Sequence, residues 1–128
     1  MLAFLDGDTF AGMTFLLTFE DITHILYLAV PQDLRDKGYG SAILQKIREL
    51  YQGQRIIADL ELPEANIPNE AQRKKRTAFY EKNGYVFTDI VYRWENEDYR
   101  IMSDGGDVTF DEFRRFWQYF LVRPVSDK

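Results

Sequence analysis

The feature that most constrains the fold is a strand–helix–strand segment in the first half of the chain. Thr23–Val30 is rich in β-branched and aromatic side chains, which favour a strand, and Arg55–Leu62 has the same character. Between them, apolar residues recur at helical spacing at Ile43, Leu44, Ile47, Leu50 and Tyr51. Two neighbouring strands joined through a helix run parallel, so the chain predicts a sheet with a helix on one face.

The residues before this segment predict an antiparallel meander. Leu2–Leu5 and Phe10–Phe19 flank Asp6-Gly7-Asp8, which is a strong signal for a tight turn. Gly12 lies inside the second of these strands and predicts a bulge or the close approach of another backbone. Glu20-Asp21 predicts the turn into the third strand.

The second half of the chain predicts two more strands and two more helices. Asn69 can cap a helix that runs to about Asn83, with Gly84 as the residue that ends it. Two strands and a last helix follow, the helix opened by a capping box and striped with aromatic residues. Their residues are Tyr85–Tyr92 and Asp98–Met102 for the strands, Thr109 and Glu112 for the box, and Phe110, Phe113, Phe116, Trp117, Phe120 and Leu121 for the stripe.

The predicted order is therefore β-β-β-α-β-α-β-β-α. This order predicts an α/β (α+β) fold in which a mixed, largely antiparallel sheet is flanked by helices. A chain of 128 residues is long enough for one core, so we expect residues 1–128 to form a single domain.

Composition excludes several classes of function. The chain has no cysteine and one histidine, which excludes a disulfide framework and a cysteine nucleophile and argues against a metal site. The net charge of −5 is opposite to that of a general nucleic-acid binder and favours a cationic partner. The longest apolar run, Ile25–Val30, is far shorter than the ~20 residues of a membrane-spanning helix. We expect a cytoplasmic protein that binds neither nucleic acid nor membrane.

The segment that follows the third strand has the design of an anion site. The strand ends in Leu28-Ala29-Val30-Pro31, and the run Arg35-Asp36-Lys37-Gly38-Tyr39-Gly40-Ser41 leads into the helix. Backbone N–H groups at a helix start have no intrahelical partner, and glycine lets an anion approach them closely. Two cationic side chains add charge. Taken alone, the same residues also fit an ordinary strand-to-helix turn.

This segment resembles the acyl-CoA signature of the GNAT superfamily of N-acyltransferases, which reads Arg/Gln-x-x-Gly-x-Gly/Ala after such a strand. A second block, Ala78-Phe79-Tyr80-Glu81-Lys82-Asn83-Gly84-Tyr85, resembles the family's Phe-Tyr-Glu-Lys-x-Gly-Phe helix end. The two blocks lie in the family's order with a strand between them, and the resemblance covers roughly residues 1–102.

The resemblance implies that acetyl-CoA is the co-substrate. No metal is expected, because the chain has one histidine and no cysteine. The family's pantetheine arm pairs with the main chain at positions that match Leu28, Ala29 and Val30. In the family, this strand and the one matching Arg55–Leu62 splay apart, and a backbone N–H on the first strand stabilises the oxyanion. The positions that match the pyrophosphate site are Arg35, Asp36, Lys37, Gly38, Tyr39, Gly40 and Ser41.

The resemblance also suggests the catalytic residues. Tyr80 matches the usual general acid, which protonates the leaving thiolate; the alternative is a core tyrosine. Asp59 and Glu61 share one face of their strand, and Glu61 is the preferred base; alternatively, these carboxylates are only solvated or bind a cationic substrate. His24 is expected to have a surface or packing role.

The charged run Arg73-Lys74-Lys75-Arg76 is mostly expected on a solvated helix face, although one of its residues can pair with a CoA phosphate.

The predicted function is transfer of acetyl from acetyl-CoA to a primary amine of a small molecule or peptide. Attack is expected to be direct, because no cysteine is present to form an acyl-enzyme. The chain starts in a strand, where a typical family member has a further strand and helices first, so the alternative is a catalytically weak acyl-CoA-binding or regulatory module. A third possibility is a small α/β interaction protein whose glycine loop binds no phosphate. The exposed sheet edge suggests a homodimer.

Overall fold

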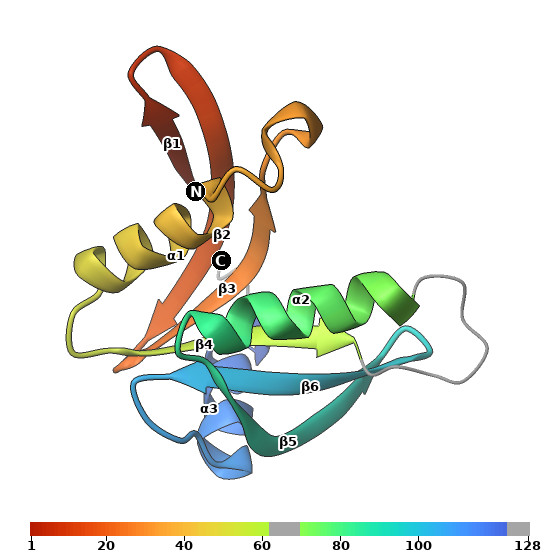
Figure 1. Cartoon of the computed structure of the whole chain (residues 1–128). Coiled ribbons are helices and arrows are strands. Elements are labelled where there is room, and N and C mark those ends of the chain that lie inside the picture. The colour runs from red at the N-terminus through yellow and green to blue at the C-terminus, as the bar shows by residue number, and fades with distance from the viewer. Residues whose placement is uncertain (62–69, 123–128) are drawn as a thin grey trace.

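Figure 1 shows the computed structural model of the protein, which describes residues 1–61 and 70–122. Its elements are β1 (Leu2–Asp6), β2 (Thr9–Phe19), β3 (Ile22–Ala29), the short 3-10 helix η1 (Gln32–Leu34), α1 (Tyr39–Leu50), β4 (Arg55–Glu61), α2 (Glu70–Lys82), β5 (Val86–Trp94), β6 (Glu97–Asp104) and α3 (Phe110–Val122). The predicted order of strands and long helices is confirmed. The proposed cap at Asn69 and the predicted strand end at Leu62 lie outside the described residues.

The strands form one six-stranded sheet in the order β1-β2-β3-β4-β6-β5. β3 and β4 pair in parallel, as the strand–helix–strand segment predicts, and the other neighbouring strands pair antiparallel. β1 lies at one edge of the sheet, where the sequence places an unpaired edge; the homodimer expected there stays a prediction.

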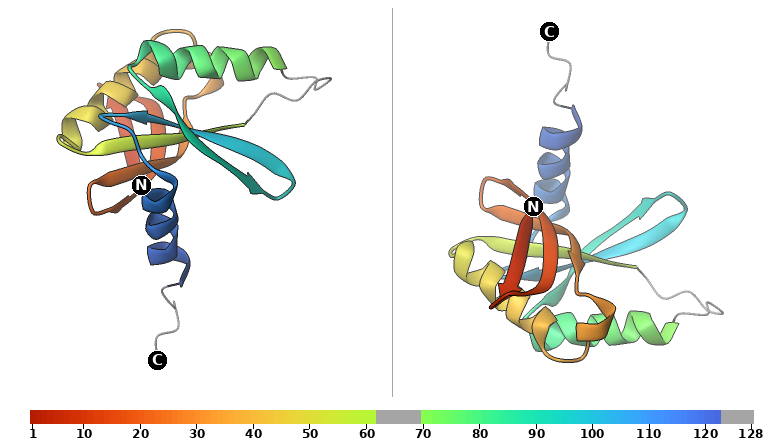
Figure 2. Two further views of the ribbon diagram at one scale, coloured as in Figure 1. Left: turned by 90° about the horizontal axis from the view of Figure 1, so that it is seen from below. Right: turned by 90° about the horizontal axis from the view of Figure 1, so that it is seen from above.

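The sheet has a helical layer on each face. Figure 2 shows α1 and α2 on one side of the sheet and α3 on the opposite side. Each face has its own buried cluster: residues such as Ile47 and Ile56 meet under α1 and α2, and residues such as Ile57 and Phe116 meet under α3. Ile56 and Ile57 are neighbours on β4, so the strand's alternation sends its side chains into both cores.

Several boundaries differ from the sequence prediction. α1 begins at Tyr39 rather than after Gly40, because Gly38 adopts a left-handed conformation (φ 84°) that starts the helix earlier. β5 and β6 extend further toward each other than predicted. Glu95 and Asn96 both have positive φ (49° and 68°), which is the geometry of a tight two-residue hairpin turn. The turn strengthens the pairing of the two strands up to Trp94 and Glu97.

Gly12 permits a close approach between two strands and α1. A Cβ on this residue would lie 2.6 Å from the backbone oxygen of Ala29 and 2.6 Å from Cδ1 of Ile43. The β1–β2 register shifts just before it, between Phe4 and Leu5. The close approach predicted for Gly12 is confirmed, and a register shift lies beside it, where Ala11 is skipped.

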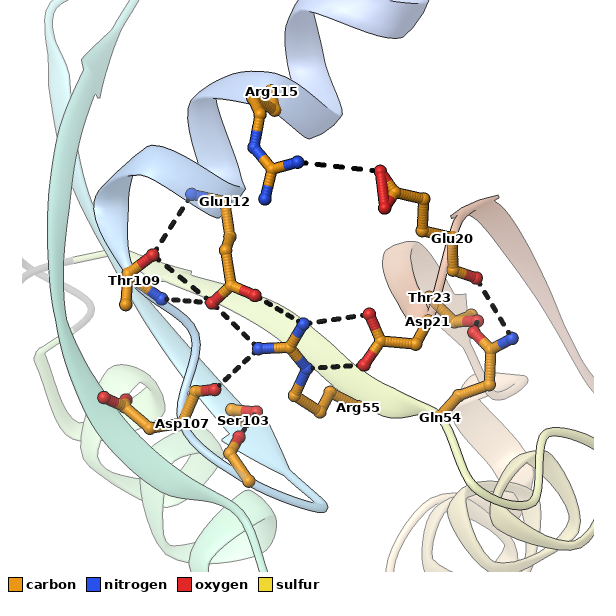
Figure 3. A network of polar contacts seen from close by, with 11 residues as sticks. Glu20, Asp21, Thr23, Gln54, Arg55, Ser103, Asp107, Thr109, Glu112 and Arg115 are labelled. Carbon is orange, nitrogen blue, oxygen red and sulfur yellow. Dashed lines mark hydrogen bonds and ion pairs between the residues drawn. The ribbon is translucent and has the colours of Figure 1, made fainter.

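The start of α3 is fixed by a polar network (Figure 3). The predicted capping box forms, since the Glu112 N–H donates to Thr109 Oγ1 (3.2 Å) and the Thr109 N–H donates to Glu112 Oε1 (3.0 Å). Arg55 at the start of β4 donates to the carboxylates of both Glu112 and Asp21. This network holds α3 against the sheet.

Candidate active site

β3 and β4 stop pairing before either strand ends. Their parallel register runs from Ile22↔Arg55 to Ile25↔Ala58, whereas β3 continues to Ala29 and β4 to Glu61. Figure 1 shows the two strands diverging beyond this point. The splay that the resemblance implies is therefore present in the sheet, and it leaves backbone groups of both strands without a partner across the gap.

A β-bulge accompanies the splay. The register of β2 with β3 passes from Leu16↔Ile25 to Phe15↔Tyr27 and skips Leu26. Thr14, fully buried on β2, donates its hydroxyl to the Tyr27 carbonyl (2.7 Å) and so holds β3 beyond the bulge. A bulge bends its strand, which here turns the end of β3 away from β4.

A cavity of about 730 Å³ extends from the end of β3 along the turn before α1 to the face of α2. Most residues of the predicted cofactor site line it: Leu28, Ala29, Val30, Arg35, Asp36, Gly38, Gly40 and Ser41. Lys37 and Tyr39 do not line it. Tyr39 instead donates its hydroxyl to Asp6 Oδ2 (2.8 Å), and this hydrogen bond raises the pKa of the phenol.

The cavity has the electrostatics of an anion site. The first bond within α1 joins the Ala42 N–H to the Gly38 oxygen (3.1 Å), so the N–H groups before Ala42 have no intrahelical acceptor. Gly38, the cap residue, offers no side chain to them. The cationic side chains that line the cavity are Arg35, Lys75, Arg76 and Lys82. Lys75 forms an exposed ion pair with Asp36 (3.0 Å).

The two helices that wall the cavity touch directly. A Cβ on Gly40 would lie 3.0 Å from two ring atoms of Phe79, so glycine is what lets α1 lie this close to α2. Asn83, beyond the end of α2, donates to Ser41 Oγ (3.1 Å) and to the Phe79 carbonyl (2.8 Å). Of the basic run on α2, Lys75 and Arg76 line the cavity, which is more of the run than we expected.

A second cavity, of about 270 Å³, lies where the strands part. Its lining is Ile25, Leu26, Tyr27 and Leu28 from β3, Asp59 from β4, and Arg76 and Tyr80 from α2. Tyr27, Leu28 and Arg76 line both cavities, so the two spaces adjoin. A molecule in the larger cavity can therefore reach into the gap between the strands.

Tyr80 is held rigidly at this junction. It is 7% exposed, and its ring lies edge-on to Phe79 and Tyr85, with centroids 5.2 Å and 5.3 Å away. Burial raises the pKa of Tyr80 to about 12. The phenol therefore keeps its proton at neutral pH, where it can donate but does not serve as a base.

The two carboxylates of β4 have different surroundings. Asp59 lines the smaller cavity and accepts from His24 Nε2 (2.5 Å) and from the Tyr92 hydroxyl. Glu61 does not line either cavity, and its Oε2 forms an ion pair with Arg73 Nη2 (2.7 Å).

His24 differs from the sequence expectation in its partner. It is fully buried beside α3, so the packing role is present, whereas a surface role is wrong. The sequence does not reveal that it contacts Asp59, because that depends on the parallel register His24↔Ile57. This register places Asp59 two residues further along the same face.

The family assignment comes from comparison with known proteins. The profile of the acetyltransferase (GNAT) domain matches residues 1–87. A search of curated protein sequences finds no significant match.

Solved structures of acetyltransferases share the fold. A GNAT-family acetyltransferase from Bacteroides thetaiotaomicron superposes with a TM-score of 0.73 at 20% identity, over 94% of this chain and 70% of that one. The Escherichia coli ribosomal-protein-S18-alanine N-acetyltransferase gives 0.62 at 18% identity, over 82% and 67%. An aminoglycoside 6'-N-acetyltransferase complexed with coenzyme A gives 0.63 at 14% identity, over 80% and 69%.

The mixed, mostly antiparallel six-stranded sheet flanked by helices is the fold that this chain shares with those acetyltransferases. The chain belongs to the GNAT acetyltransferase family. Within residues 1–61 and 70–122, no group of acidic and histidine side chains is placed to hold a metal ion. No helix in this part of the chain is long and apolar enough to cross a bilayer.

Proposed function

We propose that the protein transfers the acetyl group of acetyl-CoA to a primary amine of a small molecule or peptide. The observation that carries the proposal is the parting of β3 and β4 after Ile25↔Ala58, beside a cavity that leads to the start of α1. A thioester needs such a gap to present its carbonyl to an incoming amine. The acidic net charge of −5 favours a cationic acceptor.

The residues around the larger cavity fit a CoA diphosphate. The N–H groups at the start of α1 point to the turn, and Arg35, Lys75 and Arg76 bring positive charge to the same space. Beyond Ile25, the edge of β3 that faces β4 is unpaired, and with Val30 just after it this edge offers main-chain groups of Leu28 and Ala29 to a pantetheine arm, as an added strand would.

The acetyl transfer itself then takes place in the smaller cavity. Acetyl-CoA supplies an activated acyl group, and an amine that reaches the thioester carbon displaces the thiolate directly. Tyr80 lines this cavity and its hydroxyl is protonated, which suits proton donation to the departing sulfur.

The test is a calorimetric titration with acetyl-CoA, followed by transfer of radiolabelled acetyl to spermidine, an aminoglycoside and a peptide with a free N-terminal alanine. Micromolar binding with transfer to at least one amine is the expected result. Binding without transfer to any of them favours the alternative, an acyl-CoA-binding or regulatory module. No binding of acetyl-CoA overturns the proposal and favours an interaction protein.

A further inference from the structure

We propose that Asp59 accepts the proton of the acceptor amine and that His24 and Tyr92 are the residues that position its carboxylate. This inference rests on the proposed acetyl transfer. It adds the side chains that prepare the amine for attack, a role that the sequence gives to Glu61.

Asp59 is the carboxylate that the fold brings to the reacting gap. It follows Ala58, the last residue of β4 that pairs with β3, so it lies at the point where the strands part. Its side chain is 26% exposed, and Asp59 is one of the residues that line the smaller cavity, together with Tyr80. The proposed proton acceptor and proton donor therefore line one space and come from different elements.

Each carboxylate oxygen of Asp59 has a hydrogen-bond partner on another strand. His24 Nε2 lies 2.5 Å from Oδ1, and the Tyr92 hydroxyl donates to Oδ2. Burial raises the pKa of Tyr92 well above its usual value, with the charge of Asp59 as a further cause, so Tyr92 remains a donor. Each carboxylate oxygen has a second lone pair, which leaves Asp59 able to accept a proton from the cavity side.

His24 supports the Asp59 carboxylate from within the core under α3. Its ring is fully buried, with the rings of Phe116 and Trp117 at 5.7 Å and 5.4 Å. Among the described residues, its Nδ1 has no hydrogen-bond partner. The contact of Nε2 with Oδ1 and the packing of the ring therefore fix the orientation of the Asp59 carboxylate.

The remaining polar groups around Asp59 come from other elements. Tyr80 and Arg76 face the same cavity from α2, and Tyr99 on β6 stacks on Tyr92 with centroids 5.3 Å apart. Glu61 lies two residues further along β4, but Arg73 holds it in an ion pair (2.7 Å). Asp59 is therefore the carboxylate of β4 that an amine in the cavity meets.

The proton balance is complete with these groups. An ammonium acceptor gives one proton to Asp59, directly or through water, and becomes a neutral amine. Attack forms the N–C bond and breaks the C–S bond, and Tyr80 gives its proton to the thiolate. The new amide nitrogen gives its second proton to solvent, and solvent returns one proton to the Tyr80 phenolate, which restores the phenol. Asp59 releases its proton to solvent before the next turnover, so one proton is released overall.

The test compares Asp59→Asn, Glu61→Gln and Tyr92→Phe with the wild type in the acetyl-transfer assay, using the amine from the panel that the wild type acetylates. We expect Asp59→Asn to lower kcat/KM at least about 100-fold at pH 7. Activity should partly recover as the pH approaches the pKa of the free amine, about 10.4 for a lysine-like group, because the amine then loses its proton without help. We expect Glu61→Gln to lower kcat/KM less than Asp59→Asn does, because Arg73 holds Glu61 in an ion pair.

Tyr92→Phe provides the readout for positioning. The variant keeps the ring but loses the hydroxyl, so we expect a lower kcat, an unchanged KM for acetyl-CoA and a shifted acid limb in the pH profile. Asp89→Asn, at an exposed position of β5, is the matched control and should match the wild type. Thermal unfolding and the acetyl-CoA titration show which variants are folded. If Asp59→Asn does not fold, the acid limb of Tyr92→Phe decides.

Each outcome bears on the inference. A folded Asp59→Asn with wild-type kcat/KM overturns it, as does a loss confined to Glu61→Gln or an unchanged pH profile in Tyr92→Phe. A wild type that binds acetyl-CoA but acetylates none of the amines overturns the proposed function, and this inference with it. That result is seen before any variant is made, so the two failures are distinguishable.

Discussion

The guanidinium of Arg55 binds both carboxylate oxygens of Glu112, at 2.9 Å from Nη1 and 2.7 Å from Nη2. This pair joins the first residue of β4 to the first turn of α3, across 57 positions of the chain. Hydrogen bonds from Arg55 lower the pKa of Glu112 to about 2, and the same bonds raise the pKa of Arg55. The docking of α3 therefore depends on an ionised Glu112.

The first prediction concerns stability in acid. The pKa of Glu112 is lower in the folded chain, about 2, than its ordinary value of 4.5, so its ionised form stabilises the fold above pH 4.5. This contribution is lost as the pH falls from 4.5 toward 2. We expect Glu112→Gln to lower the free energy of unfolding at pH 7 by about 1–2 kcal/mol and to make the curve flatter in acid. Urea unfolding followed by tryptophan fluorescence measures both.

Asp111→Asn is the control for this prediction. Asp111 lies in the same turn of α3, but its side chain is 78% exposed and its ion pair with Arg114 is on the surface. We expect the control to unfold like the wild type. Equal slopes of stability against pH in the wild type and Glu112→Gln would contradict the prediction.

The second prediction concerns Gly12→Ala. The added Cβ would lie 2.6 Å from the backbone oxygen of Ala29, and backbone cannot rotate away as a side chain can. We expect a loss of about 1–3 kcal/mol in the free energy of unfolding and weaker binding of acetyl-CoA, because Ala29 lines the larger cavity, where we propose that the coenzyme binds. Chemical denaturation and calorimetry provide the two numbers. A variant as stable as the wild type would show that the strands separate here without cost.

The third prediction tests the anion site at the start of α1. Gly38 has a φ of 84°, and a Cβ there meets no atom within 4 Å, so asparagine, which tolerates this conformation, should fit. The aspartate side chain of Gly38→Asp has the same size as asparagine but adds a negative charge beside the proposed diphosphate site. We expect Gly38→Asp to weaken acetyl-CoA binding about tenfold or more relative to Gly38→Asn, with the difference shrinking at high salt. Equal dissociation constants would argue against a phosphate at this turn.

The fourth prediction concerns Tyr80→Phe. The variant keeps the ring contacts with Phe79 and Tyr85 and removes only the hydroxyl in the smaller cavity. We expect kcat to fall about 100-fold while the dissociation constant of acetyl-CoA stays within twofold. Tyr85→Phe is the control, because Tyr85 is buried in the same cluster but lines neither cavity. Full turnover in Tyr80→Phe would remove the general-acid role.

Local patterns predicted most of the fold. Turn residues such as Gly7, the apolar stripe of α1 and the capping box of Thr109 and Glu112 each lie within a few residues, so the sequence displays them directly. Some element boundaries differ from the prediction. The left-handed Gly38 starts α1 at Tyr39, and the β5–β6 hairpin extends to a turn at Glu95. Backbone conformation at single residues decides such limits, and residue type only biases it.

For the candidate site too, the sequence predicts the local features, whereas contacts between distant residues were not predicted. The segment from Leu28 to Ser41 is continuous in the chain, so its place around one cavity follows from local order. Lys37 and Tyr39 are exceptions, and the Tyr39 hydroxyl contacts Asp6, 33 residues away, instead. The sequence also did not predict the partners of Asp59 and Glu61. The two residues lie two apart on one face of β4, and only contacts with other elements distinguish them.

The sequence by itself determined the order of the elements, the glycine turn before α1 and the residues that can carry charge to it, because these features depend on neighbours along the chain. Tertiary structure alone decided that β3 and β4 part after Ile25 and Ala58, that Arg76 borders both cavities and that Asp59 meets His24 and Tyr92. Those contacts join strands and helices through register and packing, and a change of one residue in register sends every side chain of a strand to the opposite face.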